Sequence, residues 1–230
     1  MKRQLLFTYL IIALISFNVT AQSSYDEHNL DPYVTQNSVT DDHDFTYVGT
    51  PYFNEEFQKG VIYKDDLAVA SNVGLRYNAN KDVFEFKRKV TSNNNQAKYL
   101  VKTEDISLKM KNNLFVFIPA SKENSAPGYY ILLYKGENIS LYKKTKKIFI
   151  AGQKAYSSLA SNVEPTYKGK EILYLCDTDG NLSELPNSKK GKIKAFSDHN
   201  NEIKQYIKEN DLNISKEYNL IKLVKYFDTF

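Results

Sequence analysis

The densest set of chemically active side chains is a basic run, Lys143, Lys144, Lys146 and Lys147, interrupted only by Thr145. Ammonium groups at this density attract phosphate and carboxylate oxygens. The run is therefore a candidate contact for an anionic partner, such as outer-membrane lipid or another anionic polymer of a cell envelope. The same lysines also suit the end of a hairpin, because Lys keeps exposed sheet edges soluble. The sequence leaves both interpretations open.

Two acidic segments resemble metal sites without completing one. Residues 41–44, DDHD, have ligand types that divalent ions use, but nothing nearby closes a coordination shell, which favours a solvated linker. Residues 177–181, DTDGN, resemble a calcium loop. Placing Gly180 at the sixth loop position would put Leu175 first, where a carboxylate is required. We therefore predict no metal site, and a hairpin turn at 177–181.

The sequence contains few of the residue patterns that mark a catalytic site. The three histidines, His28, His43 and His199, are scattered, and no nucleophile elbow, HExxH or P-loop pattern is present. The acidic pairs at 55–56 and 65–66 are chain neighbours, which point to opposite faces of a strand and so do not suggest a shared pocket. We predict no catalytic residue and no cofactor. An envelope hydrolase is kept only as a third hypothesis, since paired carboxylates need no fixed spacing.

The elements that must position the lysines have a β pattern. From about residue 47 to 196, short apolar runs alternate with turn signals, and the 18 Tyr and 13 Phe residues favour pleated, half-buried surfaces. In the first predicted hairpin, a two-residue loop at Asn80-Lys81 sets Arg76 against Glu85, a favourable cross-strand pair. One face then carries the apolar side chains Leu75, Tyr77, Phe84 and Phe86.

Three more hairpins follow. One turns at Asn112-Asn113 and is expected to place Ile106, Leu108 and Met110 on the same face as Phe115 and Phe117. Another turns near Gly136-Glu137 and is expected to match Leu132 with Leu141 and Tyr134 with Ile139. A fourth is signalled by Asp179-Gly180, a strong hairpin turn whose register the sequence does not fix. Hairpins with one apolar face predict a curved antiparallel meander or a partly open barrel.

The period changes from 2 to 3.6 after Phe196. Apolar residues at helical spacing predict two C-terminal helices, at about 197–210 and 215–228, that pack on each other or on the sheet. The fold class expected is mainly β (α+β). The one cysteine, Cys176, lies in an apolar run and is expected to be a small core residue, since no internal disulfide can form.

The N-terminal segment has the order of a secretory signal. Lys2 and Arg3 precede an uncharged apolar run at 5–17, and small residues end at Ala21, which predicts cleavage before Gln22. The apolar run is shorter than the ~20 residues of a spanning helix, and no comparable run follows, so no transmembrane segment is expected after cleavage. Residues 22–46 are acidic and aperiodic, which predicts a flexible arm that could fold back on the basic remainder. Residues 47–230 are expected to form a single β-rich domain.

A family resemblance covers most of this mature chain. The segments 49–57 (GTPYFNEEF), 60–63 (GVIY), 75–79 (LRYNA) with Asp82 and 85–86, and 203–210 through 220–227 resemble a group of exported, uncharacterised proteins from the Bacteroidota. The resemblance implies a location in a diderm cell envelope. It implies no activity and transfers no functional residue.

Three functional hypotheses follow. The first is an exported, non-enzymatic envelope protein with a binding or assembly role, in the periplasm or outside the cell, or peripheral to the outer membrane. Its expected partners are an envelope protein or outer-membrane lipid, and not nucleic acid, which export removes. The second is a carrier of an apolar ligand such as a lipid, which needs a curved sheet with an unfilled inner face. The third is the envelope hydrolase.

Overall fold

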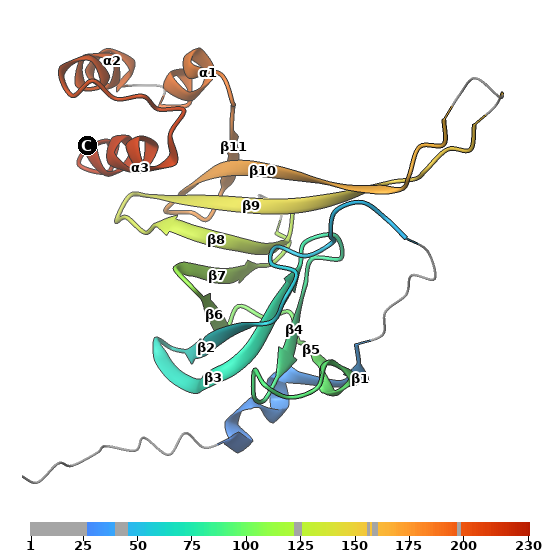
Figure 1. The fold of residues 1–230 in the computed structure, drawn as a ribbon. Coiled ribbons are helices and arrows are strands. Elements are labelled where there is room, and N and C mark those ends of the chain that lie inside the picture. The colour runs from blue at the N-terminus through green and yellow to red at the C-terminus, as the bar shows by residue number, and fades with distance from the viewer. Residues whose placement is uncertain (1–26, 40–45, 122–125, 156, 158–160, 197–198) are drawn as a thin grey trace, which may run out of the picture.

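The computed structural model describes residues 27–39, 46–121, 126–155, 157, 161–196 and 199–230. Their main feature is one antiparallel sheet of eleven strands in the order β1-β5-β4-β3-β2-β6-β7-β8-β9-β10-β11 (Figure 1). The strands are β1 (Val34–Ser38), β2 (Gln58–Lys64), β3 (Leu67–Asn78), β4 (Val83–Lys87), β5 (Lys98–Leu100), β6 (Ile106–Met110), β7 (Asn113–Ile118), β8 (Gly128–Tyr134), β9 (Ile139–Ile150), β10 (Thr166–Asp177) and β11 (Leu182–Leu185). The predicted fold class, mainly antiparallel β with C-terminal helices, is confirmed.

The β3–β4 hairpin has the predicted register. Tyr77 lies opposite Phe84, and Arg76 lies opposite Glu85. The Arg76 Nε donates to the Glu85 carboxylate at 2.7 Å, and the guanidinium stacks over the ring of Tyr52. Alternation of apolar and polar residues was sufficient here, because a slip by one residue would have buried Arg76 and exposed its neighbours.

The β6–β7 hairpin turns one residue earlier than predicted. Met110 pairs with Asn113, so the loop is Lys111-Asn112 rather than Asn112-Asn113, and Lys111 adopts the left-handed conformation (φ 54°). Leu108 lies opposite Phe115. The predicted shared face is nevertheless correct, because moving a two-residue loop by one position shifts the pairing by two, which preserves the side-chain period.

The predicted register of β8 with β9 is wrong. Leu132 pairs with Tyr142, and Tyr134 pairs with Leu141, with a bulge between the two pairs. The turn that follows is held by a residue distant in sequence. The Asp228 carboxylate accepts hydrogen bonds from the backbone of Asn138 at 2.8 Å and of Ile139 at 2.9 Å. Nothing in the local sequence encodes this acceptor, so local alternation gave the wrong partners.

The hairpin at Asp179-Gly180 is present. Cys176 pairs with Leu182 in β10–β11, and Gly180 has φ 83°, which a residue with a side chain rarely adopts. Asp177 closes the loop by accepting from the backbone amides of Asp179 and Asn181. The expected place of Cys176 in the core is wrong: the residue is only partly buried, because it lies one pair from the end of β10.

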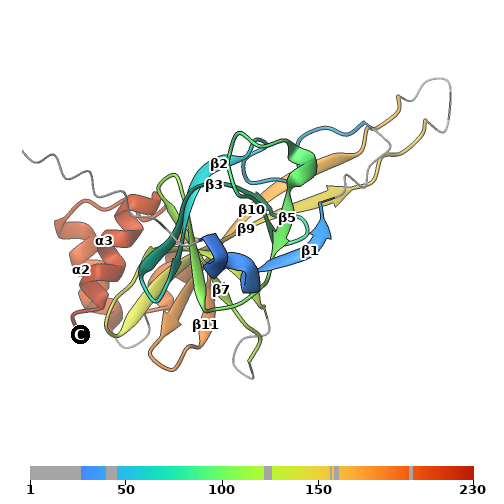
Figure 2. The same ribbon diagram turned by 90° about the horizontal axis from the view of Figure 1, so that it is seen from below.

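The helices are α1 (Lys189–Lys194), α2 (Asn200–Glu209) and α3 (Glu217–Phe227). The two C-terminal helices were expected at 197–210 and 215–228, and α1 was not expected. Helix α1 has a single apolar side chain, Ile193, so it carries no helical period to detect. The helices gather at one end of the sheet beside β8–β9, while β9 and β10 run on past the opposite end (Figures 1 and 2).

The N-terminal segment is more ordered than predicted. The flexible arm expected at 22–46 instead contributes a 3-10 helix, η1 (Glu27–Tyr33), and β1, which pairs with β5. Leu30 of η1 is buried at 2% exposure, so one aliphatic side chain anchors this otherwise polar segment in the core. The predicted signal at 1–21, with the segment 22–26, and the DDHD stretch at 41–44 lie outside the described residues.

The described residues form three apolar clusters, the smallest of which surrounds Tyr130, Ile172 and Tyr174. The largest lies inside the curl of the sheet and is packed with aromatic rings: the Tyr77 and Phe84 rings stack at 5.0 Å, and Phe84 meets Phe115 edge-on at 5.0 Å. The second lies between β8–β10 and the helices, with Phe196, Leu220 and other apolar residues. Among the described residues, no helix combines the length and the apolar character needed to cross a membrane.

The sheet is strongly curled but is not closed by strand pairing. The β3–β4 turn, at one side of the curl, reaches β9, which is distant from it in the strand order. The Lys147 amide donates to the Ala79 carbonyl at 3.0 Å, and the Asn80 side chain donates to the Lys147 carbonyl at 2.8 Å. This contact brings the β3–β4 turn beside the basic run of β9.

Candidate functional site

The four predicted contact lysines lie in the middle of β9 rather than at a hairpin end. Lys143 makes an ion pair with Glu217 of α3, at 2.7 Å. Lys144 is buried, whereas Lys146 and Lys147 are half-buried. Because neighbours in a strand point to opposite faces, the run does not form one patch. Lys143, which holds a helix, shares one face of β9 with Lys147, and Lys144 shares the other face with Lys146.

Lys144 has its own set of partners. Its Nζ donates to the Pro127 carbonyl at 2.8 Å and lies 3.6 Å from the Asp82 carboxylate. The same ammonium group lies over the ring of Tyr130, at 4.5 Å from the centroid. Burial lowers the pKa of Lys144, and Asp82 acts in the opposite direction. A buried ammonium that is paired in this way contributes to local structure more than to ligand capture.

Asp82 joins three parts of the sheet. Its carboxylate accepts a hydrogen bond from the Tyr77 hydroxyl at 2.6 Å and from the Tyr129 amide at 3.1 Å, in addition to facing Lys144. Burial raises the pKa of Tyr77 far above its usual value, and the neighbouring Asp82 raises it further. The Tyr77 hydroxyl therefore stays protonated and donates to Asp82. Together with Tyr129 and Lys144, these residues hold the β3–β4 turn against β8 and β9.

Gly128, the first residue of β8, makes room for this cluster. Its φ is 141°, and a Cβ at this position would overlap both the Asp82 carboxylate and the Lys144 ammonium group. A glycine is required here because the lysine side chain reaches Asp82 past this point of the backbone. Neither Gly128 nor Asp82 lies near the basic run in the chain, so the sequence does not mark them as part of a site.

An open cleft of about 530 Å³ lies beside the cluster. Its walls are the β3–β4 turn, the chain before β8 and the central part of β9, and its lining includes Asn80, Lys144, Thr145, Lys146 and Lys147. The volume is in the range of small-ligand sites. With Lys144 matched by Asp82, the remaining positive charge of the cleft comes from Lys146 and Lys147.

Thr145 is the unusual residue of this cleft. Its side chain is 7% exposed, and among the described residues its hydroxyl has no hydrogen-bond partner. Most buried polar groups in folded proteins are paired, because leaving one unpaired costs about 1–3 kcal/mol. A ligand oxygen in the cleft would supply the missing partner.

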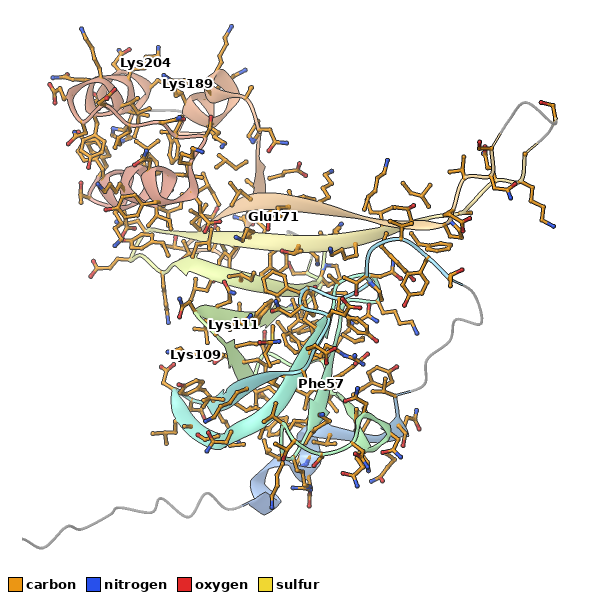
Figure 3. All side chains as sticks on the ribbon, viewed as in Figure 1. Phe57, Lys109, Lys111, Glu171, Lys189 and Lys204 are labelled. Carbon is orange, nitrogen blue, oxygen red and sulfur yellow. The ribbon has the colours of Figure 1, made fainter. Side chains whose placement is uncertain are left out.

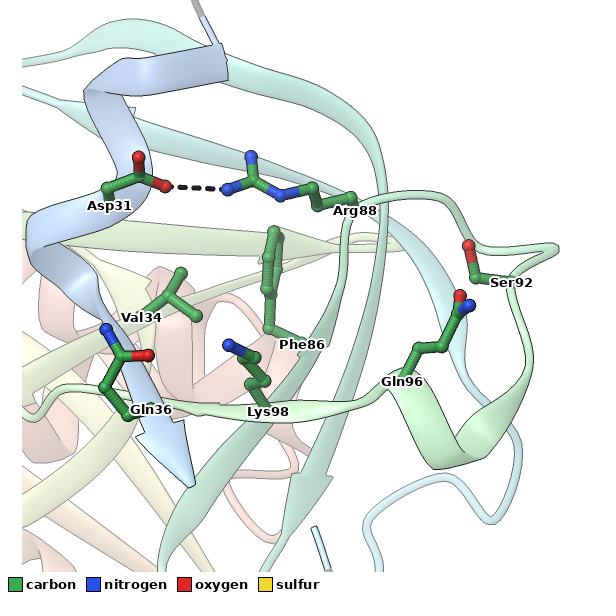
Figure 4. Close-up of a pocket in the computed structure, with 8 residues that line it drawn as sticks. All are labelled: Asp31, Val34, Gln36, Phe86, Arg88, Ser92, Gln96 and Lys98. Carbon is green, nitrogen blue, oxygen red and sulfur yellow. Dashed lines mark hydrogen bonds and ion pairs between the residues drawn. The ribbon is translucent and has the colours of Figure 1, made fainter. Parts of the chain in front are cut away.

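Two other clefts were compared with this one. The first, of about 470 Å³, lies between η1–β1 and β4–β5, with Phe86 in its wall (Figure 4). Asp31 and Arg88 pair across it at 2.6 Å, so its opposite charges satisfy each other. The second, of about 520 Å³, lies between α1 and α2, where Lys189 and Lys204 point outward (Figure 3). Among the described residues that line these two clefts, no side-chain hydroxyl is buried without a partner.

The described residues contain no group of three or more His, Cys, Asp and Glu side chains placed to hold a metal ion. Comparison with known protein families, with curated proteins and with solved structures finds no match. The cleft itself is therefore the feature from which a function can be proposed.

Proposed function

We propose that this protein is an exported, non-enzymatic binding protein of a cell envelope that holds an anionic group in the cleft beside β9. The N-terminal charge, apolar run and small residues before Gln22 support export. The ligand class is a phosphate or carboxylate group, because Lys147 and Thr145, which share one face of β9, both line the cleft.

The observation that carries this proposal is the buried Thr145 hydroxyl, which has no partner among the described residues. A hydroxyl can both donate and accept, so it suits an anionic oxygen and its protonated form equally. A core position with no ligand to serve would be expected to hold Val, which has the same shape and loses nothing on burial.

The carrier hypothesis is less well supported. An apolar ligand would need room inside the curl of the sheet, but that face is filled by buried rings, including Tyr77, Phe84 and Phe115. The residues with acid–base character also favour binding over hydrolysis, because Asp82, Tyr77 and Lys144 already satisfy one another.

The test is the variant Thr145→Val, measured by isothermal titration with inorganic pyrophosphate and, separately, with citrate. Loss of one hydrogen bond to a charged ligand is expected to weaken binding about 10-fold. The two titrants distinguish phosphate from carboxylate. Without titrant, the variant is expected to be as stable as the native protein or more so, by about 1 kcal/mol, because no hydrogen bond is broken.

The matched control is Thr166→Val, since Thr166 also lies in the ribbon of β9 and β10 but donates to the Glu164 carbonyl at 3.1 Å. This change is expected to leave titration unaltered. Absence of binding of either anion to the native protein, or equal binding by Thr145→Val, would refute the proposed ligand class.

Export is tested separately by cell fractionation and N-terminal sequencing of the released protein. The first residue is expected to be Gln22. An intact Met1 in the cytoplasmic fraction would contradict the export proposal while leaving the titration result valid.

A further inference from the structure

The second surface of interest is the part of β9 and β10 that runs past the rest of the sheet. Strand β8 pairs with β9 at residues 141–143, and β11 pairs with β10 at 173–176. Beyond these contacts, β9 and β10 continue as a two-stranded ribbon in which Ile150 pairs with Thr166. The ribbon projects from the body of the protein in both views (Figures 1 and 2).

One face of this ribbon is covered. Phe149 and Tyr167 are direct cross-strand partners on this face, with ring centroids 5.1 Å apart. The Tyr47 ring meets the Tyr167 ring edge-on at 5.1 Å, and Val48 forms a parallel bridge with Thr166. Tyr167 is consequently buried, and this side of the ribbon already has its packing partner.

The opposite face carries exposed apolar and basic side chains together. The register places Ile148 opposite Lys168 and Lys146 opposite Lys170, with Ile150 next along β9. Ile148 is 48% exposed and Ile150 is 42% exposed, and both Lys168 and Lys170 are exposed. The nearest acidic residue of the ribbon, Glu171, pairs with Thr145 and so lies on the other face.

Two features of this face are unfavourable in water. Like charges directly opposite each other, as in Lys146 and Lys170, destabilise a pair of strands. Two neighbouring branched aliphatic side chains remain in contact with solvent. An anionic surface with an apolar layer beneath its charges relieves both, because it neutralises the lysines and buries Ile148 and Ile150. A soluble polyanion would relieve only the first.

We propose that this face of the β9–β10 ribbon, defined by Lys146, Ile148, Ile150, Lys168 and Lys170, docks on the surface of an anionic lipid bilayer. The occupant follows from charge and apolar complementarity together. The lysines contact lipid phosphates, and the two isoleucines enter the boundary between headgroups and acyl chains. Lys146 and Ile148 also line the cleft, whereas Lys168 and Lys170 do not, so these two lysines separate the docking face from the cleft.

The test is co-sedimentation of the purified protein with vesicles of phosphatidylcholine alone and of phosphatidylcholine with 30 mol% phosphatidylglycerol (roughly one anionic lipid in three, enough to attract basic segments). The native protein is expected to bind only the anionic vesicles. The double variant Lys168→Gln/Lys170→Gln is expected to bind about 30-fold more weakly. Ile148→Ser/Ile150→Ser is expected to weaken binding by at least about 10-fold through lost apolar burial.

Matched controls come from the other end of the sheet. Lys109 and Lys111, beside the β6–β7 turn, are exposed lysines away from the ribbon (Figure 3), and Leu67 is an exposed apolar residue in β3. Lys109→Gln/Lys111→Gln and Leu67→Ser are expected to bind vesicles as the native protein does. Thermal melting checks that every variant is folded.

Three results would overturn the proposal: no binding of the native protein to anionic vesicles, equal binding by the folded ribbon variants, or equal losses in the controls. A fourth arm uses soluble polyphosphate. If polyphosphate binds tightly and Ile148→Ser/Ile150→Ser does not weaken vesicle binding, the ribbon recognises an anionic polymer and not a bilayer. Pyrophosphate titration of Lys168→Gln/Lys170→Gln, whose two positions lie outside the cleft, is expected to be unchanged and separates this result from the test of the cleft.

Discussion

At the scale of single residues, the four lysines of the basic run have two roles: among the described residues, two form ion pairs within the protein, and two do not. Lys143 and Lys144 are held by Glu217 and Asp82, which leaves Lys146 and Lys147 for a ligand. Substitutions of the first pair should therefore affect stability, and substitutions of the second pair should affect binding.

Gly128 provides the sharpest prediction at this scale. Gly128→Ala is expected to destabilise the protein by about 3 kcal/mol or more, because its methyl group displaces the buried Asp82–Lys144 pair. Gly180→Ala is the control. Gly180 also has positive φ, but nothing lies within 4 Å of a Cβ there, so about 1 kcal/mol is expected. Urea denaturation measures the free energy of unfolding of both variants. Equal losses of stability would show that backbone conformation alone explains the need for glycine at position 128.

The sequence identified the lysines but could not assign their roles. Their density in residues 143–147 marks a basic site on any fold. Their partners, Asp82 and Glu217, are distant in the chain and carry no motif, so only the tertiary arrangement shows which ammonium groups are already paired. The Thr145 hydroxyl, which has no hydrogen-bond partner among the described residues, can likewise be recognised only from the structure, because its burial cannot be read from the sequence.

At the scale of elements, the end of α3 fastens the β8–β9 turn. Asp228 accepts from the Tyr134 hydroxyl at 2.7 Å as well as from backbone amides of the turn. Partial burial acts to raise the pKa of Asp228. The hydrogen bonds from Tyr134 and from the amides of Asn138, Ile139 and Glu137 outweigh it, and the net pKa lies below the usual value.

This arrangement predicts a specific response to acid. A carboxyl whose pKa is depressed in the folded state stabilises the protein above its unfolded pKa, near 4, and that stabilisation is lost as pH falls through the folded value. Native protein is therefore expected to lose stability between about pH 5 and pH 3, and Asp228→Asn to lose less over the same range. The variant is expected to be less stable at pH 7 by about 2 kcal/mol. Urea midpoints at both pH values measure this, and parallel pH profiles would contradict it.

Element boundaries show where local patterns suffice. Alternation of apolar and polar residues predicts the β3–β4 register correctly because both faces of that hairpin are defined. Aromatic side chains occupy one face, and the Arg76–Glu85 pair occupies the other. Alternation failed in β8–β9, where the bulge and the Asp228 contact reset the pairing. Helix α1 was missed because a six-residue helix with one apolar residue has no period to read.

At the scale of the whole molecule, the curl of the sheet is maintained by contacts between parts that are not neighbours in the strand order. The backbone of Lys147 both donates to Ala79 and accepts from the Asn80 side chain. These two bonds bring the β3–β4 turn to β9 and thereby form one wall of the cleft. Curvature was predicted from the apolar face of the hairpins, but the closing contact was not, because its partners lie 67 residues apart and no local pattern marks them.

Removing this contact is expected to increase local opening near Lys147 without unfolding the whole protein. Asn80→Ala removes one hydrogen bond, worth about 1 kcal/mol, and is expected to speed amide exchange at Lys147 about 5-fold. Gln205→Ala, which removes the Gln205–Glu209 bond within α2, should leave exchange at Lys147 unchanged. Hydrogen exchange followed by NMR distinguishes the two. Unaltered protection at Lys147 in Asn80→Ala would show that the sheet holds its curl without this contact.

The anchoring of the β8–β9 turn by Asp228 also sets an order of events during synthesis. The pairing of β3 with β4 joins strands that are close in the chain and can form as soon as both leave the ribosome. The turn at 137–139 has to wait for an acceptor that is 89 positions later, counted from Ile139. Until then its amides have no carboxylate, and the surface of β8–β9 that α3 covers stays open. A hairpin that is completed so late leaves part of the chain unfolded during translation, and an unfolded chain is what the proposed export requires.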